Sequence, residues 1–276
     1  MKDILSLKQF TAEDIAEIFA IADEIPSGKY NSLMKGRTAV LFFPESSIRT
    51  RITFEKGVAL LSGQSILFPP ETLDKKEELR DVCGYLDNWA DIVIVRHSSH
   101  AKIDTLAEYL EAPVINAMTK TDHPCEMLTD MYALSKIRED FTKDKFLFVG
   151  KDGNIGRTWK EASEIMGFSL EQCCAPGCEV DGLVTYNDIE SAIVGKDIVC
   201  TDALSEDVLE GFRKCQVTKK AMDMANPGAV LNPCPPFFRG EEVSADVIDS
   251  EYFVGYDFKK YLLEVQQALI VYCLTR

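Results

Sequence analysis

Short apolar runs alternate with amphipathic segments along the whole chain. The runs at 38–43, 91–96 and 145–150 have apolar interiors, which is typical of strands buried on both faces of a sheet. Between such runs, apolar residues such as Phe54 and Val58 recur every three to four positions, which is the period of a helix. This alternation predicts parallel sheets covered by helices on both faces.

The first half opens with a helix predicted over residues 3–25. Thr11 and Asp14 form a capping box within it, and Pro26-Ser27-Gly28 ends it. The elements predicted from there to residue 138 are strands at 38–43, 65–68, 91–96 and 113–116, and helices at about 48–62, 78–89, 101–111 and 125–138.

The pattern then repeats in the second half. It predicts a helix at about 157–166 and strands at 145–150, 169–174, 197–201, 229–232 and 252–255. A long amphipathic segment at about 257–274 predicts a last helix that packs back on the first half. The fold class is therefore α/β, with two similar-sized domains, each a parallel sheet flanked by helices. We expect the domains at 1–132 and 133–256, with 257–276 returning to the N-terminal domain.

Composition narrows the class of protein. The chain has 276 residues, of which 46% are hydrophobic and 27% charged, and no apolar run approaches the roughly 20 residues of a membrane span. The N-terminus lacks the long apolar core of a signal peptide, so we expect a cytoplasmic protein. A net charge of −15 disfavours nucleic acid and anionic membranes as partners.

The nine cysteines favour a reducing compartment without a disulfide framework. Cys173-Cys174-Ala175-Pro176-Gly177-Cys178 is their only cluster, and the three histidines lie far from it in sequence. We interpret the cluster as packing residues, and expect neither a metal nor a cofactor.

Candidate chemistry begins at the turn after the first strand. Ser46, Ser47, Arg49 and Thr50 stand where a strand is predicted to turn into a helix N-terminus. Free backbone N–H groups and the helix dipole favour an anion there, and a guanidinium fork matches phosphate oxygens two at a time. A phosphate site is one interpretation. A capped helix with solvent-exposed arginines is the other.

A glycine-rich turn, 150–158, follows the strand at 145–150. Its spacing is not that of a dinucleotide fingerprint, and no suitable acidic residue for a ribose follows, so we exclude a nicotinamide cofactor. The helix N-terminus with Arg157 and Thr158 remains a candidate carboxylate or phosphate site.

Five short motifs follow one another along the chain. They are the opening segment 5–14, Ser47-Ile48-Arg49-Thr50-Arg51, Arg96-His97, His123-Pro124-Cys125-Glu126 and Asn232-Pro233-Cys234-Pro235. In this order they resemble the aspartate/ornithine carbamoyltransferase family over nearly the full chain, where the second corresponds to S-T-R-T-R, the fourth to H-P-x-Q and the last to H-P-L-P or H-C-L-P. The resemblance implies carbamoyl phosphate bound by the N-terminal domain, an amino-acid acceptor bound by the C-terminal domain, and homotrimers with active sites between subunits.

The resemblance also implies roles for single residues. Ser47, the position of Ile48, Arg49, Thr50 and Arg96 would surround the phosphate. His123 would donate to the carbonyl oxygen as negative charge grows there. Glu126 and the main-chain carbonyls near Cys234 and Pro235 would hold the carbamoyl NH2. Arg49, Arg96, His123 and Glu126 are thus the expected catalytic residues.

Several positions depart from the family pattern. Ile48 replaces a threonine, so one hydroxyl contact to phosphate is missing. Glu126 replaces a glutamine and puts a negative charge near a dianion. Asn232 replaces a histidine, and the loop at 71–78 offers Lys75 or Lys76 as the basic residue that reaches a neighbouring subunit's site.

The acceptor is predicted from features of both family branches. Asp202 and Ser205 resemble the ornithine branch, whose acidic residue meets an α-amino group, and Asn154 would take the α-carboxylate. Arg157 and Arg239 lie in segments that resemble the aspartate branch. Because acidic residues at 202–207 suit a cationic acceptor, we favour ornithine or a related diamino acid, with citrulline as product and arginine biosynthesis as the implied pathway.

Two alternatives stay open at this point. One is an aspartate carbamoyltransferase. The other is a catalytically degenerate relative that binds a phosphate-bearing metabolite, which the substitutions at 48, 126 and 232 motivate.

Overall fold

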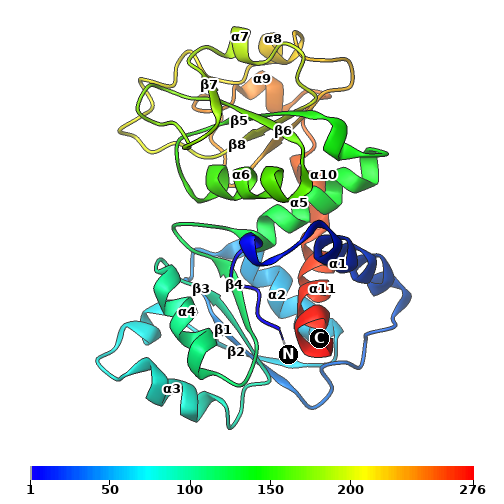
Figure 1. The fold of residues 1–276 in the computed structure, drawn as a ribbon, viewed down its shortest axis with the longest axis vertical. Coiled ribbons are helices and arrows are strands. Elements are labelled where there is room, and N and C mark those ends of the chain that lie inside the picture. Colours follow the sequence, from blue (N-terminus) through cyan, green and yellow to red (C-terminus); the bar gives the residue numbers. More distant parts are fainter. Residues whose placement is uncertain (1) are drawn as a thin grey trace. The chain divides into compact units, whose positions relative to one another are not determined.

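The computed structural model describes residues 2–276, which divide into two compact units (Figure 1). Unit 1 contains the residues up to 132 together with 260–276, and unit 2 contains residues 133–259. Each unit is a parallel sheet with helices packed against it, so the predicted α/β class is confirmed.

Unit 1 holds a sheet of four parallel strands in the order β2-β1-β3-β4. Its strands are β1 (Thr38–Phe42), β2 (Gln64–Phe68), β3 (Ile92–Arg96) and β4 (Val114–Met118). Its helices are α1 (Ala12–Glu24), α2 (Ile48–Leu60), α3 (Leu79–Leu86), α4 (His100–Tyr109), the greater part of α5 (Pro124–Ile137) and α11 (Leu262–Thr275), with 3-10 turns η1 (Leu7–Gln9), η2 (Ile25–Ser27) and η3 (Pro70–Asp74).

The C-terminal helix α11 packs on α1 and α2, as the sequence predicts. Gly57 lies at the close contact of α2 with α11, where a Cβ would lie 3.1 Å from Cγ of Gln267. The last helix is nevertheless shorter than predicted. It is preceded by a separate helix, α10 (Gly255–Lys260), and the two are interrupted at Tyr261.

The N-terminal segment also differs from its prediction. The helix expected over 3–25 begins only at Ala12, because Ser6 caps η1 and Thr11 caps α1. Ile4 instead extends beside β4: its N–H donates to the Val114 carbonyl at 2.8 Å, and its carbonyl accepts from Asn116 N at 2.7 Å. The predicted capping box of Thr11 and Asp14 is confirmed.

Unit 2 holds a sheet of five parallel strands in the order β7-β6-β5-β8-β9. Its strands are β5 (Lys145–Val149), β6 (Ser169–Cys173), β7 (Val184–Tyr186), β8 (Ile198–Thr201) and β9 (Val230–Pro233). Its helices are α6 (Asn154–Met166), α7 (Ile189–Ala192), α8 (Lys219–Met222) and α9 (Ala245–Ile248), with the 3-10 turn η4 (Phe141–Lys143).

Two predictions in this half need correction, and one strand was missed. The segment 252–255 is not a strand, because only a single bridge joins Phe253 to Leu231 before α10 begins. Helix α6 begins at Asn154 instead of residue 157, directly after the extended Gly153. Strand β7 was not predicted, because Val184 and Thr185 are exposed and form no apolar run.

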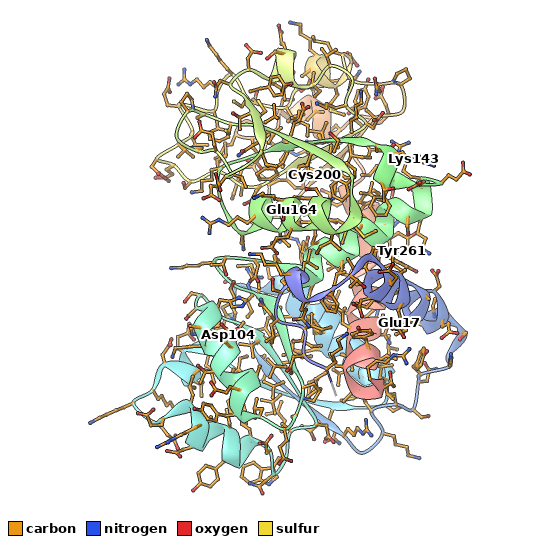
Figure 2. All side chains as sticks on the ribbon, viewed as in Figure 1. Glu17, Asp104, Lys143, Glu164, Cys200 and Tyr261 are labelled. Atoms are coloured by element: carbon orange, nitrogen blue, oxygen red, sulfur yellow. The ribbon has the colours of Figure 1, made fainter. Side chains whose placement is uncertain are left out.

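Many polar side chains on the helices reach solvent, whereas most side chains of the inner strands are buried. Asp104 on α4 and Glu164 on α6 are exposed, whereas Cys200 is buried within β8 (Figure 2).

Each sheet has one point where successive crossovers leave in opposite directions, between β1 and β3 in unit 1 and between β5 and β8 in unit 2. Ligands of open α/β sheets bind beyond the carboxyl ends of the strands at such points.

Candidate functional site

The predicted phosphate turn lies at the carboxyl end of β1, beside that of β3. Arg96 is the last residue of β3, and its guanidinium donates to Oγ of Ser47 at 2.9 Å. Ser47 and Thr50 are buried, while Arg49 is exposed at the first turn of α2. The structure therefore brings the Arg96 segment to the Ser47 turn, although 49 residues separate them in sequence.

The two arginines of this turn differ in their surroundings. Arg51 donates from Nε to Glu55 at 2.6 Å, one helical turn later, so its charge is already compensated. Arg49 has no ion pair among residues 2–276. Ile48 begins α2 and is 63% exposed, so the side chain that replaces the expected threonine is accessible at the phosphate turn.

His123 and Glu126 stand at the start of α5. His123 directly precedes the helix, Glu126 lies in its first turn, and both side chains are buried. The approach to this helix is held by Asp122, whose Oδ1 accepts from Thr119 Oγ1 at 2.6 Å and from Asn116 Nδ2 at 2.9 Å. These bonds hold the β4–α5 turn, and so help to fix where the His123 backbone leaves the sheet.

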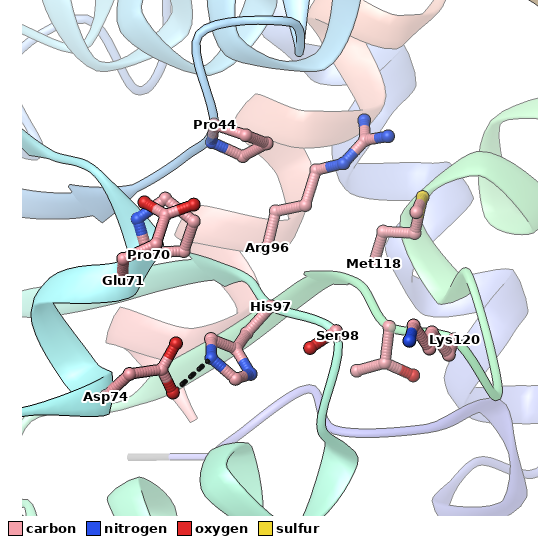
Figure 3. A pocket seen from close by; sticks show the side chains of 10 residues that line it. Pro44, Pro70, Glu71, Asp74, Arg96, His97, Ser98, Met118 and Lys120 are labelled. Atoms are coloured by element: carbon pink, nitrogen blue, oxygen red, sulfur yellow. Dashed lines mark hydrogen bonds and ion pairs between the residues drawn. The ribbon is translucent and has the colours of Figure 1, made fainter.

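A cavity of about 300 Å³ opens beyond the carboxyl ends of the same strands (Figure 3). Its lining residues are Pro44, Pro70, Glu71, Asp74, Arg96, His97, Ser98, Met118, Thr119 and Lys120. Of the predicted site residues, only Arg96 lines it, and its guanidinium extends away from Asp74 in this view.

His97 in this cavity has a defined hydrogen-bond pattern. Its Nδ1 accepts from the Ser99 N–H at 2.9 Å, so Nε2 carries the proton and donates to Oδ1 of Asp74 at 3.2 Å. Lys102 lies 2.6 Å from the same Asp74 oxygen, and its ammonium holds the pKa of that carboxyl below its usual range. The bond from His97 thereby attaches η3 to the end of β3.

Sequence reasoning missed Asp74 and Lys120 as members of this wall. Lys120 follows β4, and its N–H donates to the Ser98 carbonyl at 3.3 Å. The available signals were a basic residue shortly after the predicted strand at 113–116, for Lys120, and the charged loop at 71–78, for Asp74. Lys75 and Lys76, the lysines predicted to reach a neighbouring subunit, are exposed just after η3.

Unit 2 gathers the predicted acceptor residues at its own crossover point. Asn154 begins α6 after β5, and Asp202 and Ser205 follow β8. A Cβ built on Gly153 would lie 3.6 Å from Oδ2 of Asp202, so the glycine turn passes close to this carboxylate. Oδ1 of Asp202 accepts from the Ala203 N–H at 2.9 Å.

The other two predicted acceptor residues are held by local carboxylates. Arg157 makes a bidentate pair with Asp152, with both N–O distances at 2.7 Å. Arg239 lies 2.9 Å from Asp249 and also donates to the Ala245 carbonyl. Both guanidinium groups are therefore already neutralised by carboxylates of this chain, and neither is available to bind the second carboxylate of an aspartate acceptor.

The end of β9 carries the last predicted motif. The Cys234 N–H donates to the Thr201 carbonyl at 2.9 Å, which places Cys234 beside the end of β8, and the following Pro235–Pro236 peptide is cis. Asn232 is buried within β9 and pairs in register with Cys200.

Glu242 is a buried acid that sequence reasoning did not single out. Its side chain is 1% exposed, and Oε1 accepts from the Phe238 N–H at 2.8 Å. Burial raises the pKa of Glu242 to about 7, and the carboxylates of Glu241 and Asp202 contribute in the same direction.

Groups of three or more metal-ligating side chains are absent from residues 2–276. None of the helices described is both long and apolar enough to cross a membrane.

Comparisons with known proteins agree with this geometry. Residues 2–136 match the model of the carbamoyl-phosphate-binding domain of aspartate/ornithine carbamoyltransferases, and residues 142–273 match that of their Asp/Orn-binding domain. An ornithine carbamoyltransferase of Paracidovorax citrulli is 31% identical over 99% of this chain and 96% of its own. One from Methylococcus capsulatus is 30% identical over 99% of both chains. The solved ornithine carbamoyltransferase of Pyrococcus furiosus superposes with a TM-score of 0.91 at 28% identity, covering 98% of this chain and 96% of that one.

Proposed function

This chain belongs to the aspartate/ornithine carbamoyltransferase family, and we propose that it transfers the carbamoyl group of carbamoyl phosphate to ornithine, giving citrulline and phosphate. The observation that carries the proposal is the contact between Arg96 and Ser47, which joins two motifs of the phosphate site at the crossover point of the first sheet.

The proposed phosphate site suits a dianion. Arg49 has its charge available, Arg96 is oriented by Ser47, and α2 directs its N-terminus to the same turn. These groups stabilise the phosphate as it takes the electrons of the breaking bond between the carbonyl carbon and the bridging oxygen. His123 donates to the carbonyl oxygen where negative charge accumulates. The attacking amine loses its proton to the departing phosphate, so no covalent enzyme intermediate is needed.

The acceptor side supports ornithine over aspartate. Asp202 offers a carboxylate to an ammonium, while Arg157 and Arg239 are occupied by Asp152 and Asp249. An aspartate acceptor needs additional cations for its second carboxylate. The named relatives are themselves ornithine carbamoyltransferases.

Finer properties belong to the same proposal. We expect a homotrimer in which Lys75 or Lys76 of one subunit reaches the site of the next, located in the cytoplasm and acting in arginine biosynthesis. The nine cysteines are free thiols, which suits a reducing compartment.

Product formation tests the proposal. The enzyme is incubated with carbamoyl phosphate and, separately, ornithine, aspartate, putrescine or lysine, and the ureido product is measured by mass spectrometry. Citrulline formation with ornithine as the preferred acceptor is the expected result. Phosphate release without acceptor-dependent product contradicts it.

A degenerate relative is the second candidate, favoured by the exposed Ile48 at the phosphate turn and the buried Glu126. Calorimetry separates the two functions. Tight binding of carbamoyl phosphate with no turnover across a broad amine panel supports the degenerate relative.

A further inference from the structure

Lys151 is a cation at the proposed acceptor site that the family motifs do not account for. It lies in the glycine turn after β5, between Gly150 and Asp152, and is partly buried. Its Nζ donates to Oγ of Ser205 at 2.6 Å, a residue 54 positions later. The ammonium therefore projects across the crossover point between β5 and β8, toward the loop that follows β8.

Groups of complementary charge surround that point. Asp202 begins the loop after β8, and Gly153 of the glycine turn passes close to its Oδ2. Asn154, at the start of α6, adds an amide. Asp207 lies near the same two residues. The Ser205 hydroxyl, and to a smaller extent the charge of Lys151, hold the pKa of the Asp207 carboxyl below its usual range. A cation, an amide and a carboxylate thus come together, which is the complement of an amino acid's α-carboxylate and α-ammonium groups.

We propose that Lys151 binds the α-carboxylate of the acceptor and makes the site selective for α-amino acids over simple diamines. This assignment rests on the proposed carbamoyl transfer. A carboxylate displaces the neutral Ser205 hydroxyl as acceptor of the Lys151 proton, because a hydrogen bond between two charged groups is stronger than one to a neutral oxygen. Asp202 binds the α-ammonium, and the side-chain amine stays available to attack.

The comparison of ornithine with putrescine isolates this contact. Putrescine carries the same reactive amine but lacks the α-carboxylate. In Lys151→Gln we expect kcat/KM for ornithine to fall about tenfold or more, mainly through KM, while kcat/KM for putrescine changes less than about threefold. Lys160→Gln is the matched control, because Lys160 lies on α6, is paired with Glu164, and loses the same single charge.

Each outcome decides the assignment. An unchanged preference for ornithine over putrescine in Lys151→Gln overturns it, and so does an equal loss with both substrates, since that is what a purely structural lysine produces. If the wild-type enzyme makes no citrulline, the proposed function fails, and calorimetry with norvaline, which has the α-groups but no reactive side-chain amine, judges Lys151 separately. The assignment is supported if norvaline binds more weakly to Lys151→Gln but not to Lys160→Gln. It is overturned if norvaline binds equally to Lys151→Gln and Lys160→Gln, or if it does not bind to the wild type.

Discussion

At the scale of single residues, local partners decide which charges are available to a ligand. Arg49 and Arg51 are two residues apart on α2, yet only Arg51 has a carboxylate partner within its own helix. The same distinction separates Lys151 from Arg157 in unit 2, since Arg157 is paired with Asp152. A sequence motif therefore gives the type of residue at each position, whereas the neighbouring side chains decide whether its charge is available to a ligand.

The arginine pair leads to a direct prediction. Arg49→Gln is expected to weaken carbamoyl-phosphate binding about tenfold or more, because it removes an uncompensated charge from the phosphate turn. Arg51→Gln removes the same charge from the same helix and should change binding less than about threefold. Calorimetry on both variants checks this, and equal losses would show that Arg51 also contacts the phosphate.

Glu126 makes an opposite prediction. Glu126→Gln is expected to strengthen carbamoyl-phosphate binding, because it removes a negative charge near a dianion and keeps an oxygen to accept from the carbamoyl NH2. Calorimetry measures the affinity, and a thermal melt confirms that the buried replacement is folded. Affinity that does not rise would mean that the carboxylate is compatible with the substrate.

Glu242 links acidity to stability. The pKa of Glu242 is about 7 in the folded state against an ordinary value of 4.5, so the native state holds the proton more tightly than the unfolded state does. The stability that this group contributes therefore falls as the pH rises from about 4.5 through about 7. Glu242→Gln should match the wild type near pH 4.5 and be more stable at pH 8, by at most about 3 kcal/mol. Urea unfolding at both pH values tests this against Glu251→Gln, an exposed control. A gain that does not depend on pH would refute the ionisation argument.

At the scale of elements, helix ends and crossover points organise unit 1. The carboxyl ends of β1 and β3 carry the phosphate turn and Arg96, and the bond from His97 to Asp74 attaches η3 to the same edge. The N-terminus of α1 is attached in a different way, because Asp14 both caps α1 and accepts from Tyr272 of α11 at 2.9 Å.

Asp14 therefore has a predicted effect on stability. The Thr11 backbone N–H, then Tyr272 and Lys2, hold the pKa of Asp14 well below its usual range, so its contribution is present at neutral pH and is lost as pH falls. Asp14→Asn should cost roughly 1–2 kcal/mol at pH 7, with the difference shrinking below about pH 4. Glu13→Asn is the control, since it removes a charge from the same helical turn without these bonds. Urea unfolding that gives equal losses would assign the effect to the helix dipole alone.

At the scale of the whole molecule, the expected trimer has a functional test. If Lys75 or Lys76 acts in a neighbouring subunit's site, the double variant Lys75→Gln/Lys76→Gln and the variant Arg49→Gln carry their defects on different sides of each shared site. Unfolding and refolding the two together should form hybrid trimers with more activity than the sum of the separate preparations. Ultracentrifugation should give a mass three times that of the chain. A mixture with no gain would place each site within one subunit.

The sequence by itself determined the α/β class and most strand positions, and it predicted the phosphate and acceptor motifs. It could do so because doubly buried strands must be apolar throughout, and because a strand that turns into a helix N-terminus creates an anion site from adjacent residues. The sequence also predicted that the last helix returns to unit 1, but it was wrong that this helix is amphipathic, because residues 265–273 of α11 are all buried.

Tertiary structure alone decided the rest. Ile4 and β7 join their sheets through backbone hydrogen bonds, which leave no apolar pattern in sequence. The contacts of Arg96 with Ser47 and of Lys151 with Ser205 join residues 49 and 54 positions apart, and only the crossover of parallel strands brings them together. Which charges are available for carbamoyl phosphate and its acceptor is therefore a property of the folded sheets.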